Sequence, residues 1–137
     1  MADLIYDYGL DEWRTWTTGT FEWMGLQDTY TPSRTHHYVS DVNTHEIGVS
    51  GYARDTVTTP ARTVNTTLHR ITYDCDDPNF GSPVAGETVG YVVLYQLVTN
   101  DSDSILLALY DIGDFATDGG LFSPVIGAEG AHYIDQG

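Results

Sequence analysis

Lysine is absent from this chain of 137 residues, and five arginines are its only strongly basic side chains. They are outnumbered by 20 acidic residues, so the formal charge at neutral pH is −15. A protein with that charge is repelled by duplex DNA and by anionic membranes. The sequence also lacks the roughly 18 to 20 consecutive apolar residues that a membrane-spanning helix needs. We therefore expect neither a nucleic-acid partner nor a membrane partner.

Cysteine is nearly absent too, and this limits the chemistry that the chain can perform. The single Cys75 has no second cysteine with which to form a disulfide or a thiolate zinc site. It lies in an alternating segment where a small core residue is expected. Ser102 and Ser123 lack the Gly-x-Ser-x-Gly context of a serine nucleophile, and no spacing singles out a catalytic pair among the carboxylates. We expect no enzymatic activity and no cofactor.

The pattern of apolar residues predicts short strands rather than helices. The chain contains 18 threonines and 14 glycines, which disfavour helix interiors and favour strands and turns. At most one short helix fits within residues 4–16. Two long apolar segments, 88–99 and 104–112, are joined by a polar turn and predict a central, buried hairpin. Further strands are expected at residues 18–26, 55–59, 62–67 and 69–75, with a last one at 121–126 that Pro124 interrupts.

Seven or eight short strands in a chain of this length predict one all-β domain, an antiparallel β-sandwich or a barrel-like fold with long loops. We divide it into an N-terminal arm (1–17), a β-core (18–112) and an extended, Gly-rich C-terminal segment (113–137). The long polar stretch at 27–43 is expected to be a loop with a role of its own.

Two groups of side chains could bind a metal ion, but neither has the spacing of a known site. His36, His37, His45 and Glu46 lie close in sequence without a helical His-Glu-x-x-His pattern. The aspartates form three clusters that lack the calcium-loop spacing, at 74–77, 101–103 and 111–118. We interpret the histidines as loop residues and the aspartates as turn residues, and expect no metal site.

The aromatic residues allow two interpretations. Trp13, Trp16, Trp23 and Tyr30 could stack against a sugar, or they could fill the core. Ten tyrosines in a chain of this size favour an interface, because tyrosine provides contact area and tolerates a wet rim. Arginine, the only basic residue type present, suits bidentate contacts to the acids of a partner. The candidate interface residues are Arg14, Trp16, Arg34, Arg54, Arg62, Phe115, Phe122 and Tyr133.

Several segments, taken in order, resemble a group of small virion proteins of tailed bacteriophages. They are residues 37–42 (HYVSDV), 51–52 (GY), 74–77 (DCDD), 92–95 (VVLY) and 104–111 (SILLALYD). One departure is Gln96, where the group carries lysine.

This resemblance implies a structural part of a virion with no catalytic residues. Since the acidic chain is poorly suited to packaged DNA, we expect it to decorate or cement the capsid exterior. Its partners would be the major capsid protein or other virion subunits, with the chain itself homo-oligomeric or present in many copies. A tail or neck component is one alternative, and a carbohydrate-binding β-sandwich module is another.

Overall fold

The computed structural model describes residues 3–127 and 131–135 and contains two antiparallel sheets. The larger sheet has five strands in the order β1-β7-β6-β2-β3, and the smaller one has three in the order β4-β5-β8. The strands are β1 (Leu4–Ile5), β2 (Phe21–Gln27), β3 (Asp55–Thr56), β4 (Ala61–Asn65), β5 (Arg70–Asp74), β6 (Thr88–Gln96), β7 (Ile105–Ala116) and β8 (His132–Asp135). The expected all-β, antiparallel fold is confirmed, in a sandwich-like form without a closed barrel over the described residues.

Helical structure is limited to short 3₁₀ segments in the described part of the chain. They are η1 (Asp7–Thr15), η2 (Val39–Asp41) and η3 (Asn43–His45). The helix expected within residues 4–16 is therefore present as η1, preceded by the short strand β1, which the sequence did not predict. None of the helices described is long and apolar enough to cross a membrane.

The predicted central hairpin is formed by β6 and β7, which pair from Thr88–Ala116 to Gln96–Ile105. Side chains on both faces of this sheet are buried, and this explains why its strands are almost continuously apolar. Trp23 and Leu94 lie in one core cluster, whereas Met24 and Val93, their neighbours in sequence, lie in a second cluster. The two cores therefore occupy opposite faces of one sheet.

Different segments cover the two faces of the five-stranded sheet. Trp13 of η1, Trp16 directly after it and Phe122 of the C-terminal segment belong to the first core. Tyr30 and Val39, from the polar stretch expected to be a loop, belong to the second core. That stretch thus has a structural role as a cover for the sheet.

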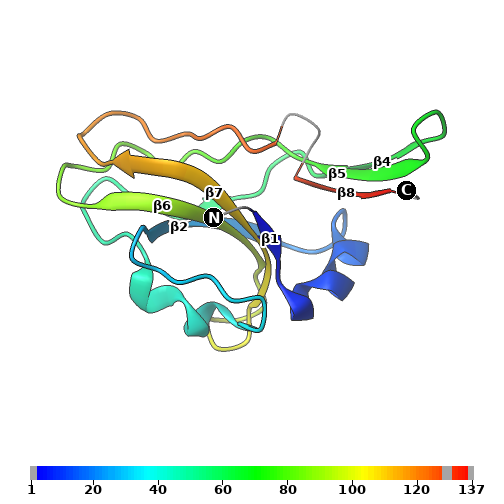
Figure 1. The fold of residues 1–137 in the computed structure, drawn as a ribbon, viewed down its shortest axis with the longest axis horizontal. Helices are drawn as coiled ribbons and strands as arrows, with labels where there is room; N and C mark the ends of the chain where they lie inside the picture. The colour runs from blue at the N-terminus through cyan, green and yellow to red at the C-terminus, as the bar shows by residue number, and fades with distance from the viewer. Residues whose placement is uncertain (1–2, 128–130, 136–137) are drawn as a thin grey trace.

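The smaller sheet extends away from the larger one (Figure 1), and we call it the projecting sheet. β4 and β5 form a hairpin, and β8 pairs with the other edge of β5 after a separation of about 60 residues in sequence. Residues 121–126 form no strand, contrary to expectation, because Pro124 cannot donate to a ladder; the last strand is β8 instead.

Candidate functional site

Arg54 is held by a network of hydrogen bonds that joins four segments of the chain. Its Nε and Nη2 donate to the two carboxylate oxygens of Glu46 at 2.7 and 2.8 Å. Its Nη1 and Nη2 donate to the two oxygens of Asp101 at 2.8 and 2.9 Å, and Nη1 also donates to Tyr95 Oη at 3.1 Å. All five N–H donors of the guanidinium are therefore used inside the chain.

The neighbours of Arg54 are themselves hydrogen-bonded. Tyr52 Oη donates to Glu46 and accepts from the backbone N–H of Gly25, and Asn43 Nδ2 donates to Asp101. The hydrogen bond from Arg54 lowers the pKa of Asp101 below its ordinary value. This network ties β2, η3 and the β6–β7 turn together, so we interpret it as a structural fastening.

Aspartates at loops and strand ends accept hydrogen bonds from backbone N–H groups. Asp103 accepts from Thr99 and Asn100, and Asp41 accepts from His37 and Tyr38. These bonds lower the pKa of both carboxyl groups. Further examples are Asp74 with Cys75, Asp77 with Ile126, Asp111 with Gly113 and Asp118 with Gly120. This geometry supports the interpretation as turn or strand-end residues for Asp74, Asp77, Asp103 and Asp118, whereas Asp111 lies within β7 and Asp101 binds Arg54.

The histidines considered as metal ligands lie among aromatic rings. Tyr30 Oη is 2.7 Å from His36 Nδ1, and His37 is stacked between Tyr8 and Tyr38. Glu46 is occupied by Arg54. Over the described residues, no three His, Cys, Asp or Glu side chains converge in a way that could hold an ion.

Cys75 is a poor nucleophile in this fold. Burial, followed by repulsion from Asp74 and other nearby carboxylates, raises the pKa of its thiol to about 12. The thiol therefore stays protonated at neutral pH.

The four aromatic residues proposed as a sugar platform are all in the core. Trp13, Trp16, Trp23 and Tyr30 are each at most 3% exposed. Their rings contact other core rings, for example Trp16 with Phe21 at 4.9 Å between centroids. The core interpretation is correct for these residues. Because they are buried, they are not available to stack against a sugar, and they no longer support the sugar-binding alternative.

Three predicted interface residues are engaged within the chain, two of them buried and Arg54 partly buried. Trp16 donates through Nε1 to the carbonyl of Asp74, Phe122 is buried against Phe80, and Arg54 is fully bonded as described. For these residues, the sequence could not distinguish a side chain needed by the fold from one reserved for a partner.

The other candidates lie at or near the surface but are scattered over it. Arg14 is exposed and forms an exposed ion pair with Asp11. Arg34 and Arg62 are exposed, and Phe115 is partly buried with its ring stacked on Phe122. Tyr133 is exposed, with the guanidinium carbon of Arg70 located 4.2 Å from its ring centroid. Only Arg62 and Tyr133 share an element of the fold, the projecting sheet.

An apolar row crosses one face of the projecting sheet. Val64 pairs with Ile71, and Ile71 pairs with Ile134, so all three side chains lie on the same face. Val64 is 60% exposed, and Leu68 in the adjoining turn is 53% exposed. The row borders a hollow of about 390 Å³ lined also by Asn65, Thr66, His69 and Arg70.

The base of the same face is packed against the body of the protein. Tyr73 and His132 are the next residues along this face, and both contact the Trp13 ring, with centroids 5.4 and 4.6 Å away. Tyr110 Oη donates to the carbonyl of Ala131 just before β8. The projecting sheet is therefore anchored at its base, whereas no other segment of the described residues covers its outer end, where Val64 and Ile134 are exposed.

The tip of the hairpin is preorganised and differs in charge from the rest of the chain. Asn65 Oδ1 accepts hydrogen bonds from the backbone N–H groups of Thr67 and Leu68, which shapes the turn. Residues 61–73 contain Arg62, Arg70 and no acid. The remaining residues contain three arginines and 20 acids, a net charge of −17.

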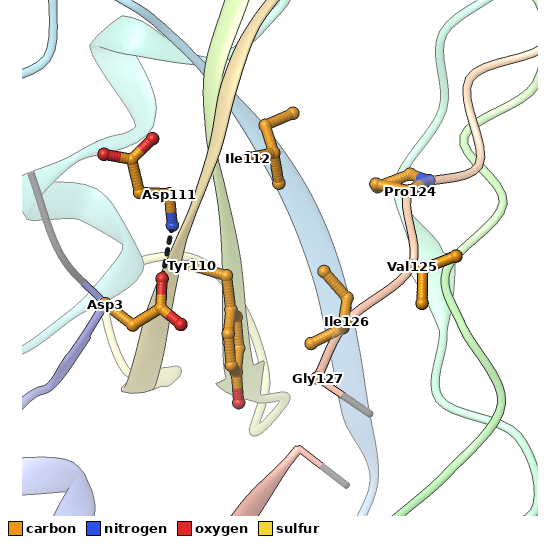
Figure 2. Close-up of a pocket in the computed structure, with 8 residues that line it drawn as sticks. All are labelled: Asp3, Tyr110, Asp111, Ile112, Pro124, Val125, Ile126 and Gly127. Atoms are coloured by element: carbon orange, nitrogen blue, oxygen red, sulfur yellow. Dashed lines mark hydrogen bonds between the residues drawn. The ribbon is translucent and has the colours of Figure 1, made fainter. Parts of the chain in front are cut away.

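A second hollow lies on the body of the protein, between β7 and residues 124–127 (Figure 2). Its volume is about 420 Å³. Asp3 and Asp111 lie at one side, where Asp3 Oδ1 accepts from the backbone N–H of Asp111 at 2.8 Å. Pro124, Val125 and Ile126 lie at the other side. The hollow thus combines carboxylates with apolar side chains.

Sequence reasoning missed the apolar row and this second hollow. The alternation in residues 69–75 did place Ile71 and Tyr73 on one face, and the structure confirms it. The absence of acids between residues 61 and 73 was a further signal that could have drawn attention to the hairpin.

No protein-family model matches the chain, and neither does any curated protein or solved structure.

Proposed function

We propose that this chain is a non-enzymatic structural protein of a bacteriophage virion and that it binds the exterior of the capsid. The observation that carries this proposal is the projecting sheet, whose outer end presents exposed apolar side chains on a preorganised hairpin. Exposed apolar patches of this kind are typical of surfaces that bind another protein. The sequence segments that resemble phage virion proteins are the reason why we propose a bacteriophage particle as the binding partner.

The charge of the chain favours the outside of a particle over its interior. At −15, each copy would be repelled by packaged DNA, whereas a basic patch on a capsid subunit would attract it. The acidic body of the chain would then add electrostatic attraction to the contact made by the projecting sheet.

Binding to purified particles tests this proposal. Particles lacking the protein are mixed with it, and the bound copies are located by electron microscopy. We expect density on the outer surface of the head. Density only at the tail or neck would move the protein to those structures, and an absence of binding would contradict a virion role.

The salt dependence of particle binding tests the role of charge. If a basic partner surface attracts the chain, the bound fraction should fall between about 0.05 and 1 M salt, because salt screens exposed charges over a Debye length. A chelator should have no effect. Attachment that resists salt but is lost with a chelator would contradict this electrostatic account and indicate a bridging ion.

A further inference from the structure

We propose that two copies of this chain pair through the outer edges of their β4 strands, so that two projecting sheets join into one continuous sheet. This contact goes beyond the proposed function, because it joins copies of the chain to one another rather than to a particle. It uses the backbone edge of β4, and its occupant is a second copy of the same strand.

β4 is the longest edge strand among those that the structure describes. The edge strands of the larger sheet, β1 and β3, have two residues each, and β8, at the other edge of the projecting sheet, has four. Beyond β1 the edge of β7 is open too, but Gly113 has a φ of 66° there, which interrupts the extended conformation.

The edge of β4, in contrast, is regular and accessible. Four of its five residues are exposed, and it pairs with β5 without a shift in register. Short strands and bulges are common ways in which proteins prevent pairing at a sheet edge, and β4 has neither. Its outer N–H and C=O groups are therefore well placed to pair with a strand of another chain.

A second β4 repeats the side-chain pattern that this edge requires. Antiparallel pairing about a two-fold axis perpendicular to the sheet keeps the same face of both sheets on the same side. Arg62 of each copy then lies opposite Val64 of the other copy, and Thr63 lies opposite its own counterpart. The alkyl part of Arg62 can cover Val64, which is 60% exposed in one chain, while its guanidinium stays in water. Cross-strand threonine pairs also stabilise sheets.

The residues on both sides of β4 define one register. Pro60, directly before the strand, has no backbone N–H to donate, and the turn shaped by Asn65 begins directly after it. Only the register centred on Thr63 pairs all five residues of one β4 with all five of the other. That register allows about four to six main-chain hydrogen bonds, depending on which residues of β4 direct their N–H groups outward.

A folded second copy is also a preorganised partner. Its β4 is already extended and paired with β5, and Asn65 Oδ1 holds the adjoining turn through Thr67 and Leu68. Pairing two such strands therefore avoids most of the ordering entropy that an unstructured segment would lose on binding the same edge.

Charge does not select this contact, and the net charge of the chain weakens it. β4 contains Arg62 and no acid, so pairing two of these strands places no carboxylates opposite one another, and the two Arg62 side chains lie diagonally. Because the projecting sheet extends away from the larger one (Figure 1), antiparallel pairing directs the two acidic bodies to opposite ends of the joined strands. Five residues span about 17 Å, which exceeds the Debye length of about 8 Å at physiological salt. Since each copy carries −15, added salt should strengthen the dimer.

A charge swap at residue 63 provides the test, because this residue faces its own counterpart in the dimer. Thr63→Lys alone and Thr63→Glu alone each place like charges opposite one another, whereas their equimolar mixture places opposite charges there. Residue 63 is exposed, so neither substitution buries a charge. Thr31→Lys and Thr31→Glu are the matched controls, since Thr31 is exposed and lies outside both sheets.

Sedimentation velocity measures the mass of each protein and of both mixtures, up to roughly 1 mM protein and at about 0.15 and 0.5 M salt. We expect the wild type and the Thr31 variants to form dimers and nothing larger, with tighter dimers at the higher salt. Each Thr63 variant alone should associate about fivefold or more weakly at the lower salt, and their mixture should recover the dimer. Thermal melting should show that every variant is folded. Amide exchange in residues 61–65 of the wild type should slow as its concentration rises, which checks the contact without a substitution.

Three results would overturn the inference: a wild type that is monomeric throughout, folded Thr63 variants that dimerise as the wild type does, or a mixture that associates no better than its components. Particle binding separates this inference from the proposed function. A wild type that binds particles but stays monomeric in solution overturns only the self-contact, whereas one that dimerises but ignores particles overturns only the virion role. The two contacts also respond oppositely to salt, which should strengthen the dimer and weaken attachment to a particle.

Discussion

The five-stranded sheet and the projecting sheet place their apolar residues in opposite ways. In β6 and β7, the side chains of Leu94 and Leu107 are fully buried, and both faces of the sheet are covered by other segments. In β4, four of five residues are exposed, and only the base of the sheet is covered. The first sheet therefore buries its apolar side chains within the chain, while the second leaves apolar side chains such as Val64 and Ile134 exposed.

Substituting an aspartate into each sheet should give the largest difference in stability between the two sheets. Leu94→Asp puts a carboxylate in a core without a partner, which should cost several kcal/mol and unfold the domain. Val64→Asp makes the same kind of change on an exposed strand and should alter stability by no more than about 0.5 kcal/mol. Thermal or urea melting checks both. A soluble, cooperatively melting Leu94→Asp would show that the five-stranded sheet is not the core we describe.

The arginines offer a second comparison. Arg54 belongs to a hydrogen-bond network that links several segments, whereas Arg14 forms an exposed ion pair. Arg54→Met leaves the carboxylates of Glu46 and Asp101 without their cation, and we expect a loss of about 2 to 3 kcal/mol, less than for a fully buried pair. Arg14→Met removes an exposed pair with Asp11 and should cost at most about 0.5 kcal/mol. Equal losses in urea unfolding would contradict the interpretation of Arg54 as a fastening.

A smaller effect should appear where the projecting sheet meets the body. Burial lowers the pKa of His132 below its ordinary value of 6.5, since the charged ring is penalised beside Trp13. The unfolded chain therefore binds more protons than the folded one as pH falls from about 6.5 toward the folded-state pKa. This contribution to stability is full above about pH 6.5 and declines below it.

His132→Phe should reduce that dependence, because its ring does not titrate. We expect the melting temperature of the wild type to fall more than that of His132→Phe between about pH 7.5 and 5.5. If the melting temperatures of the two proteins depend on pH in the same way, His132 does not contribute to the pH dependence of stability.

Local patterns in the sequence predicted much of the five-stranded sheet. The apolar segments at 88–99 and 104–112 became β6 and β7, and the expected strand at 18–26 became β2. Residues 62–67 and 69–75 also contain strands close to those expected, β4 and β5. These predictions succeeded because strand alternation and polar turns are local properties of the chain.

The arrangement of those strands depends on contacts that sequence patterns do not reveal. β8 pairs with β5 across about 60 residues, so the three-stranded sheet had no local signal. Trp16 and Phe122 could equally have been surface contacts, and only the packed structure shows that they fill the core. In the same way, three of the five hydrogen bonds of Arg54 join it to Tyr95 and Asp101, which are 41 and 47 residues away in the chain.

Amide hydrogen exchange tests most directly whether the projecting sheet is the contact element. Peptides that cover residues 61–74 and 88–96 are compared between the free chain and the assembled protein, either self-associated or bound to particles. We predict that exchange slows on assembly in residues 61–74 and stays the same in β6, which is already protected. Unchanged exchange in residues 61–74, in a sample shown to be assembled, would contradict the account.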